Sequence, residues 1–192
     1  MNIDNTKADV IIYACLALTD DNINTAKKII EKGFPFSHYV DDKIKLSETE
    51  QLKIFLRDGF IDRYTGKKVF LPVVTNILSQ AIPEVFPNHP NWKYTETHQA
   101  HALFYATVDK IVPSYSSSNK SNLVTTSYIN KIAKANANLE DLGWKLFSLE
   151  EIEEEMWDGM MEWFINYVEK HQAFLNDNII ANWYKAVRNV KS

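Results

Sequence analysis

Apolar residues recur at helical spacing through much of the chain, which predicts a protein made mainly of helices. Residues 5–18 carry one such run. Asp21 or Asn22 can cap a second helix, which we expect to continue through Ile30 and to end at Gly33. A pair of helices is therefore predicted near the N-terminus.

Two capping-box patterns indicate where further helices begin. Ser47 and Glu50 have the spacing at which each side chain bonds to the backbone N–H of the other, and Gly59 is expected to end that helix. Ser148 and Glu151 repeat the pattern ahead of a long predicted helix. One face of that helix would carry Met156, Met160, Trp163, Phe164, Tyr167 and Val168, which favours packing in the core. Two other helices are predicted at residues 72–82 and from about Asn178 onward.

Strands are predicted in the middle of the chain. The segment "FIDRYTGKKVF", residues 60–70, is typical of two short strands around a Gly-containing turn. Residues 104–112 predict a strand that Pro113 stops, and "NLVTT", residues 122–126, predicts another, followed by a helix that Ser127 caps. The predicted class is therefore α+β, mainly helical with small antiparallel hairpins. One domain is expected over residues 1–192, with helices in 1–58, a strand-containing core in 59–147 and helices in 148–192.

Composition gives no sign of a membrane or secreted protein. The chain is 45% hydrophobic and 24% charged, as in soluble globular proteins, and it lacks an apolar run of the roughly 18 residues that a membrane span needs. The N-terminal residues lack the pattern of a signal peptide. The single cysteine, Cys15, cannot form an internal disulfide and is expected to be buried in a helix core. We therefore expect a cytoplasmic protein.

The charge distribution is uneven. The net charge is −4, so there is no global basic signal for nucleic-acid binding. Basic residues nevertheless gather in segments 63–68 and 110–134. These residues can form a local basic face that binds phosphates, and the alternative is that they are scattered, solvated lysines.

One segment, "TVDKIVPSYSSSNKSNLVTTSYINKIAKAN" at residues 107–136, carries a distinctive order of features. A predicted strand with an acidic residue is followed by Pro, a polar loop, an Asn-led strand and a helix with a late Lys. Together with the blocks "RDGFIDRYTGKKVF", "FPNHPNWKYTETH" and "LEDLGWKL", this order resembles the HNH, or ββα-metal, endonuclease family. The resemblance covers roughly residues 50 to 170 and implies a ββα-metal core within residues 59–147.

The resemblance implies roles for individual residues. Asp109 matches the family's Asp that binds a divalent cation, but Lys110 occupies the position of the His that serves as general base. Asn122 matches the middle Asn, which supports the loop. On the helix, Lys134 matches the late Lys, so the position of the second metal ligand falls on Lys131.

The two lysines change the expected chemistry. A Lys with a pKa of about 10.4 is protonated at neutral pH and donates only, so Lys110 cannot replace a His base. The ammonium of Lys131 would repel a cation by about 4 kcal/mol at ~4 Å and an effective dielectric constant near 20. The predicted centre is therefore degraded, with both lysines next to Asp109 in place of the metal, and no cofactor is expected.

Several alternatives remain open. Proximity to Lys131 and partial burial can lower the pKa of Lys110 and make it a base. Asn130 can act as the metal ligand, with Asp109, while His98 or the neighbouring His101 serves as base; Mg²⁺ or another divalent cation would then be required. Lys110 can also be an engineered substitution. The second departure, at Lys131, favours natural divergence.

The favoured function is therefore that of an HNH-like protein with a degraded nuclease centre, which binds DNA or a protein partner through the former substrate face. The residues expected to contact phosphates are Arg63, Lys67, Lys120 and Lys134. One alternative is an active metal-dependent endonuclease of the restriction or defence type. Another is an interaction module whose aromatic C-terminal helices form a homodimer or a partner surface, which exposure of Trp163, Trp183 and Tyr184 would favour.

Overall fold

The computed structural model describes residues 6–36, 43–116, 118–151 and 157–191. The chain forms two compact units, residues 1–40 and 41–192, where the sequence analysis treats residues 1–192 as one domain. Both helices and strands are present, so the predicted α+β class is confirmed at that level. Within the described residues, no helix combines the length and the apolar character needed to cross a bilayer.

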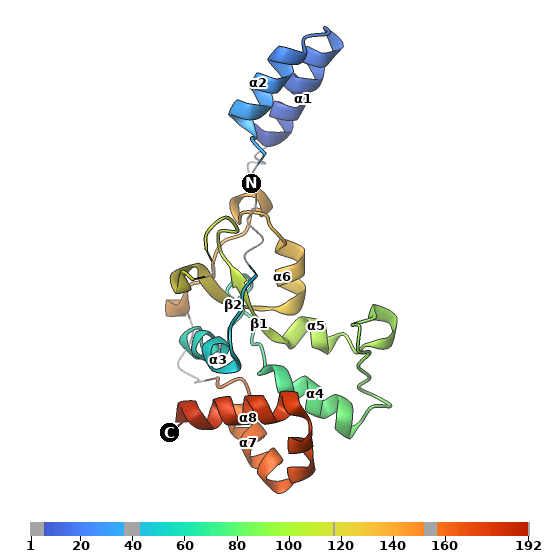
Figure 1. Ribbon diagram of the computed structural model, residues 1–192, viewed down its shortest axis with the longest axis vertical. Helices are drawn as coiled ribbons and strands as arrows, with labels where there is room; N and C mark the ends of the chain where they lie inside the picture. The colour runs from blue at the N-terminus through green and yellow to red at the C-terminus, as the bar shows by residue number, and fades with distance from the viewer. Residues whose placement is uncertain (1–5, 37–42, 117, 152–156, 192) are drawn as a thin grey trace. The chain divides into compact units, whose positions relative to one another are not determined.

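The N-terminal unit is a hairpin of two helices, α1 (Thr6–Thr19) and α2 (Ile23–Gly33) (Figure 1). Asn22 caps α2, since its side-chain oxygen accepts a hydrogen bond from the backbone N–H of Thr25 at 3.1 Å. The predicted helix pair is confirmed. The expected burial of Cys15 is wrong, because its side chain is exposed.

Helices are the most frequent elements of the second unit. The helix α3 (Glu48–Arg57) begins at the predicted capping box of Ser47 and Glu50. The predicted helix with Pro72 in its first turn is also present and is α4 (Pro72–Ala81). The other elements of this unit are η1 (Tyr94–Glu96), α5 (Ala100–Phe104), β1 (Ala106–Lys110), η2 (Lys120–Asn122), β2 (Leu123–Ser127), α6 (Tyr128–Lys134), η3 (Glu140–Leu142), η4 (Leu149–Glu151), α7 (Met161–Lys170), η5 (Gln172–Asn176) and α8 (Asn178–Lys191).

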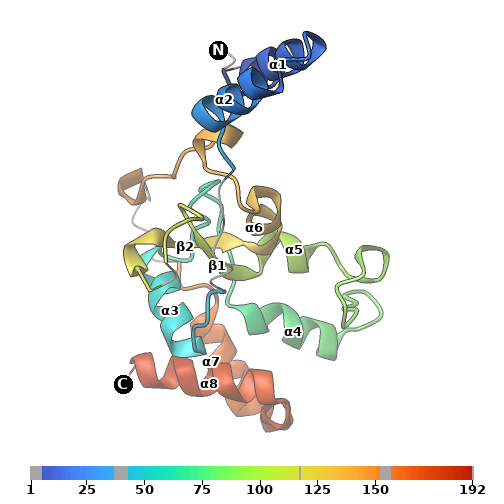
Figure 2. The same ribbon diagram turned by 45° about the horizontal axis from the view of Figure 1, so that its top comes forward.

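A two-stranded antiparallel sheet lies at the centre of this unit. Strand β1 pairs with β2 in a register that places Ala106 opposite Ser127 and Lys110 opposite Leu123. Ser127 then caps α6, so that α6 begins directly after β2 and lies beside the sheet (Figure 2). The other predicted hairpin, residues 60–70, has a single antiparallel bridge, between Ile61 and Lys68, in place of two strands.

The segment that follows α3, residues 58–63, covers the outer edge of β2. A carboxylate oxygen of Asp58 accepts from the N–H of Thr125 at 2.7 Å, and one of Asp62 accepts from the N–H of Ser127 at 2.8 Å. Between them, the backbone N–H of Arg63 donates to the carbonyl of Thr125 at 2.9 Å. The two carboxylates therefore accept the hydrogen bonds that a third strand would otherwise accept.

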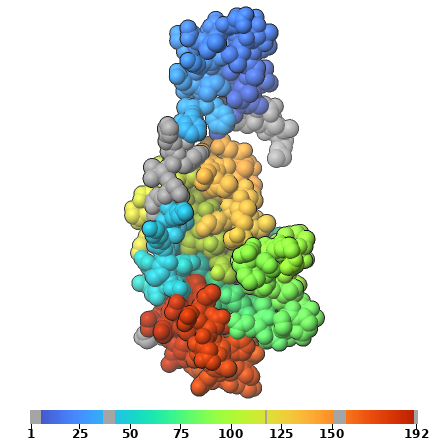
Figure 3. All heavy atoms as spheres, turned by 45° about the vertical axis from the view of Figure 1, so that its right-hand side comes forward, coloured from blue at the N-terminus to red at the C-terminus, as the bar shows by residue number. Residues whose placement is uncertain are grey.

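The C-terminal helices complete the hydrophobic core. In the space-filling view, the red C-terminal segment lies against the cyan α3 and the green α4 (Figure 3). Trp183 of α8 is buried and stacks on Phe55 of α3 with ring centroids 6.1 Å apart. Trp163 and Tyr184 are partly buried against the same core. The predicted core packing is confirmed for Trp183, whereas Trp163 and Tyr184 are only partly buried, so the alternative of a partner surface on these helices stays a prediction.

The predicted long helix from Ser148 is wrong in its extent. Residues 149–151 form only η4, and α7 begins at Met161. Gly159 and Met160 have φ angles of 66° and 68°, which are incompatible with a continuous right-handed helix. Met156, expected on the buried face, lies outside the described residues.

Candidate functional site around Asp109

Asp109 lies near the end of β1, and its carboxylate is paired within the protein. The residue is 6% exposed. The hydroxyl of Tyr64 donates to its Oδ2 at 2.7 Å, and Nζ of Lys134 lies 3.3 Å from the same oxygen. The side chain of Lys134 is itself only 1% exposed. Among the described residues, Tyr64 therefore donates to Asp109 and Lys134 is its counter-charge, and both charged side chains are largely shielded from solvent.

Two lysines of α6 cover the outer edge of β1. Lys131 and Lys134 are one helical turn apart, and their ammonium groups donate to the carbonyls of Val108 and Lys110 at 2.8 and 2.7 Å. These carbonyls are two residues apart on β1 and therefore face the same edge of the strand. The ammonium groups supply the donors that a neighbouring strand would supply.

Burial and charge act in opposite directions on Lys131. Burial lowers its pKa below the ordinary value for Lys, and the negative charge of Asp109 opposes this effect without cancelling it. Burial also raises the pKa of Tyr64, and the charge of Asp109 adds to that increase, so Tyr64 is a neutral donor. Asp109 thus interacts with two lysine side chains, Lys134 at contact distance and Lys131 through its field.

The site differs in one respect from the sequence-based expectation. That expectation places Lys110 and Lys131 next to Asp109 as the replacement for the metal. In the structure, Lys134 forms the ion pair, and Lys131 bonds to the carbonyl of Val108. Lys110 is half-buried, and its backbone carbonyl accepts from Lys134.

Asn122 holds the loop that follows β1. It is 4% exposed. Its Oδ1 accepts from the N–H of Val112 and its Nδ2 donates to the carbonyl of Val112, both at 2.9 Å. The resemblance to the HNH family assigns a loop-supporting role to this position, and the contacts of Asn122 suit that role.

The structure does not place Asn130 or His98 with Asp109. The amide of Asn130 donates to Oδ2 of Asp62 at 2.7 Å. The ring of His98 stacks on Phe86 with centroids 4.3 Å apart, and its Nδ1 accepts from the N–H of Ala100 at 3.2 Å. Both side chains therefore have packing and hydrogen-bonding partners of their own.

The basic residues expected to contact phosphates have different environments. Lys67 and Lys120 are exposed. The guanidinium of Arg63 donates to the carbonyl of Phe147 at 2.9 Å and lies 3.4 Å from Asp58, with its side chain 15% exposed. The expectation for Lys134 is corrected: its ammonium group is buried and bonded internally, so it cannot reach a phosphate in solvent.

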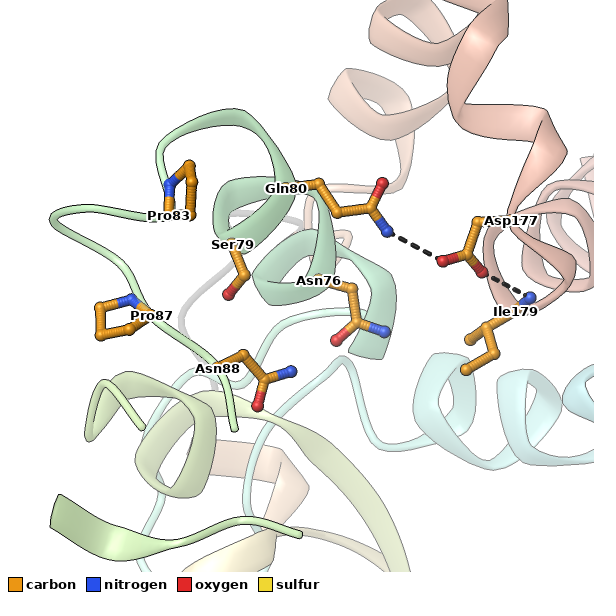
Figure 4. A pocket seen from close by; sticks show the side chains of 8 residues that line it. All are labelled: Asn76, Ser79, Gln80, Pro83, Pro87, Asn88, Asp177 and Ile179. Carbon is orange, nitrogen blue, oxygen red and sulfur yellow. Dashed lines mark hydrogen bonds between the residues drawn. The ribbon is translucent and has the colours of Figure 1, made fainter. Parts of the chain in front are cut away.

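A second, separate hollow of about 410 Å³ lies between α4 and the start of α8 (Figure 4). Gln80 donates to Asp177 across it at 2.8 Å, and Ser79 lines it. The hydroxyl of Ser79 is 2.8 Å from Nε2 of the buried His101. In a catalytic triad, the other ring nitrogen is held by a carboxylate. Nδ1 of His101 has no hydrogen-bond partner among the described residues. Burial lowers the pKa of His101, and the neighbouring His98 lowers it further. His101 is therefore best interpreted as a neutral, structural histidine.

The donors around Asp109 do not suit a bound divalent cation. Within the described residues, no group of three or more His, Cys, Asp or Glu side chains is placed to hold a metal ion. The nearest groups to the Asp109 carboxylate include an ammonium and a phenol, and an ammonium repels a cation.

No family model, no curated protein and no solved structure matched the chain when it was compared with known proteins.

Sequence reasoning did not find Tyr64 as part of this site. It lies 45 positions before Asp109, in the turn of residues 62–66, and no periodic pattern marks it. The available signal was the short block "DRYTGKK" itself, in which Asp62 accepts from the N–H of Tyr64 at 2.9 Å and so fixes the turn.

Proposed function

We propose that this chain is an HNH-like protein that binds nucleic acid without cleaving it, because internal ion pairing has replaced its metal centre. The ion pair of Lys134 with Asp109, whose nitrogen and oxygen are 3.3 Å apart, carries this proposal. The succession of β1, β2 and α6, with Asp109 facing the helix, supports the likeness to a ββα core.

Hydrolysis by a single metal requires a cation bound to the phosphate and a base that accepts a proton from water. Oδ2 of Asp109 already accepts from Tyr64 and pairs with Lys134. A cation at this oxygen would have to displace a buried ammonium group, which would then lack a counter-charge. The expected position of the base holds Lys110 in place of a His.

Binding is a separate property and depends on exposed basic side chains. Lys67 and Lys120 are exposed and lie outside the internal network of Asp109. Each phosphate contact that a lysine makes releases counterions, so affinity should fall with salt by about 0.9 logarithmic units per contact and tenfold change in salt. An acidic protein with a small basic face is expected to bind weakly and in a strongly salt-dependent manner.

Two measurements test the two parts of the proposal. Plasmid nicking with Mg²⁺, Mn²⁺ and Ni²⁺ should give no cleavage. Fluorescence anisotropy with a labelled DNA duplex over a KCl series should show binding that weakens in Lys67→Gln/Lys120→Gln, with a salt slope smaller by about 2. The matched control is Lys170→Gln/Lys185→Gln, which removes the same charge from exposed positions on α7 and α8.

The alternative function, an active endonuclease, predicts the opposite result. Metal-dependent cleavage that is lost in Asp109→Ala, while the circular dichroism spectrum is unchanged, would overturn the inactive-centre proposal. Equal DNA affinity of the test and control double variants would overturn the assignment of the binding face.

A further inference from the structure

The N-terminal hairpin exposes large apolar side chains on both of its helices. On α1, Tyr13 is 60% and Leu16 is 56% exposed, and on α2, Ile23 is 58% exposed. Four more exposed side chains extend this surface: Ile11, Ile12, Leu18 and Phe34. Of these, Ile11, Leu18 and Ile23 line one groove, and a large exposed apolar patch commonly marks an interaction site.

These apolar side chains are exposed because of the way in which the two helices pack. Only small side chains are buried between them, namely Ala14 of α1 and Ala26 of α2, each 6% exposed. At Gly33 the approach is closer still, since a Cβ atom there would lie 2.5 Å from a methyl carbon of Val10. A helix pair joined through small residues has no interior space for its Ile, Leu and Tyr side chains, which therefore point outward.

A groove between the helices gives this surface a shape. It encloses about 530 Å³, and its walls include Ile11, Leu18, Ile23 and Ile30. Cys15 also lines it. Below about 40 residues, a chain segment seldom buries enough apolar surface to be stable without oligomerisation, a metal or disulfides. The N-terminal unit, residues 1–40, is of this size, so apolar contacts from outside the hairpin would stabilise it.

We propose that the partner is a second copy of this chain, whose α1–α2 hairpin packs on the first to form a four-helix bundle. The charges on the groove identify the occupant. Lys27 and Glu31 both line the groove and are one helical turn apart on α2. A two-fold axis passing between them brings Lys27 of each copy against Glu31 of the other. A surface that carries both signs in this arrangement is complementary to itself, as an isologous interface requires.

Charge reversal tests this arrangement in the full chain. In Lys27→Glu, the interface would bring two pairs of carboxylates together, and in Glu31→Lys two pairs of ammonium groups. Sedimentation velocity over a concentration series should show a dimer for the wild type and monomers for each variant alone. An equimolar mixture of the two variants should again form a dimer, because every cross-copy pair then has opposite charges. No effect within a single chain can restore association on mixing.

Cys15 provides an independent readout because it is the only cysteine. Its alkylation by a maleimide should slow in the wild type as protein concentration rises, and stay concentration-independent in each single variant. The double variant Lys27→Glu/Glu31→Lys should dimerise like the wild type. Circular dichroism controls for helix content, since Lys and Glu have similar helix propensities.

Three results would overturn the proposal. A wild type that stays monomeric up to about 100 μM, where even weak specific dimers with Kd near 10 μM assemble, excludes the second copy as occupant. Dimers that persist in both single variants place the interface elsewhere on the chain. A mixture that remains monomeric while the variants are helical removes the two-fold pairing of Lys27 and Glu31.

Discussion

Asp109→Asn is the most informative single substitution at the candidate site. Asn has nearly the shape of Asp and can still accept the hydrogen bond from Tyr64, but it removes the negative charge. The ammonium group of Lys134, 1% exposed, is then left without a counter-charge. Breaking a buried ion pair by removing one partner costs about 3–5 kcal/mol of unfolding free energy. We expect a loss in that range.

The distance and burial of the pair support this magnitude. At 3.3 Å and an effective dielectric constant of about 20, the attraction is 332/(20 × 3.3), or about 5 kcal/mol. The two side chains are 1% and 9% exposed, so solvent screens the pair only weakly. The hydrogen bond from Tyr64, with a donor–acceptor distance of 2.7 Å, becomes weaker when its acceptor is a neutral amide oxygen, which adds to the loss.

A double-mutant cycle separates the pair from its surroundings. Lys134→Met removes the ammonium but also leaves the carbonyl of Lys110 without its 2.7 Å donor, which adds about 1–3 kcal/mol to the cost. The double variant Asp109→Asn/Lys134→Met has no unpaired charge. The double variant should therefore lose less unfolding free energy, by several kcal/mol, than the sum of the losses in the two single variants.

Urea titration followed by tryptophan fluorescence is the assay. All five tryptophans lie between positions 92 and 183, so the signal reports on the second unit alone. The titrations are run in EDTA. If Asp109 were a metal ligand without its cation, removing its charge would relieve repulsion and leave the protein as stable as before, or more so. That outcome, or strict additivity in the cycle, would refute the ion-pair account.

Four other substitutions test the surrounding structure. Burial lowers the pKa of Lys131 in the folded protein. Between that lowered pKa and about 10.4, the unfolded chain therefore binds more protons than the folded chain. In urea titrations, the unfolding free energy of the wild type relative to Lys131→Met should rise with pH across this window. Gly66→Ala should lower the unfolding free energy by more than about 1 kcal/mol, because φ is 71° and the new Cβ would lie 2.7 Å from the ring of Phe147. Gly143→Ala is the control, because φ is 64° but the new Cβ would lie in open space. Its only cost is backbone strain, so it should unfold at a higher urea concentration than Gly66→Ala. Asp62→Ala should raise amide exchange at Ser127, whose N–H loses its acceptor; unchanged exchange there would contradict the edge-covering role.

Local signals in the sequence predicted the beginnings of several elements. Ser47 and Glu50 form the capping box, with the backbone N–H of Ser47 3.0 Å from the Glu50 carboxylate. Asn22 and Ser127 cap their helices as expected. Such signals depend on residues within three or four positions of each other, so one segment of sequence contains all that is needed.

The start of α7 could not be predicted, because it depends on contacts across the fold. The segment before α7 bonds to residues 69–71: the indole N–H of Trp157 donates to the carbonyl of Val69 at 2.9 Å, and the carbonyl of Gly159 accepts from the N–H of Leu71 at 2.9 Å. A Cβ at Gly159 would lie 2.3 Å from the ring of Phe60. Tertiary hydrogen bonds and close packing therefore override the helical pattern around this glycine.

The same limit applies to the candidate site. The sequence singled out Asp109 and a lysine-bearing helix, but the order of lysines on that helix does not say which of them reaches the carboxylate. Lys131 and Lys134 are three positions apart and both face β1. Which one pairs with Asp109 depends on how the helix lies along the strand, a property of the packed structure.

The two edges of the small sheet are completed by side chains of opposite charge. The outer edge of β2 presents N–H groups to carboxylates, and the outer edge of β1 presents carbonyls to ammonium groups. Lys134 therefore has two roles, since one ammonium group both completes the edge of β1 and neutralises Asp109. A neutral side chain at this position would leave the carbonyl of Lys110 without a charged donor and Asp109 without its counter-charge. The positive charge of Lys134 is therefore part of the packed structure of this sheet edge.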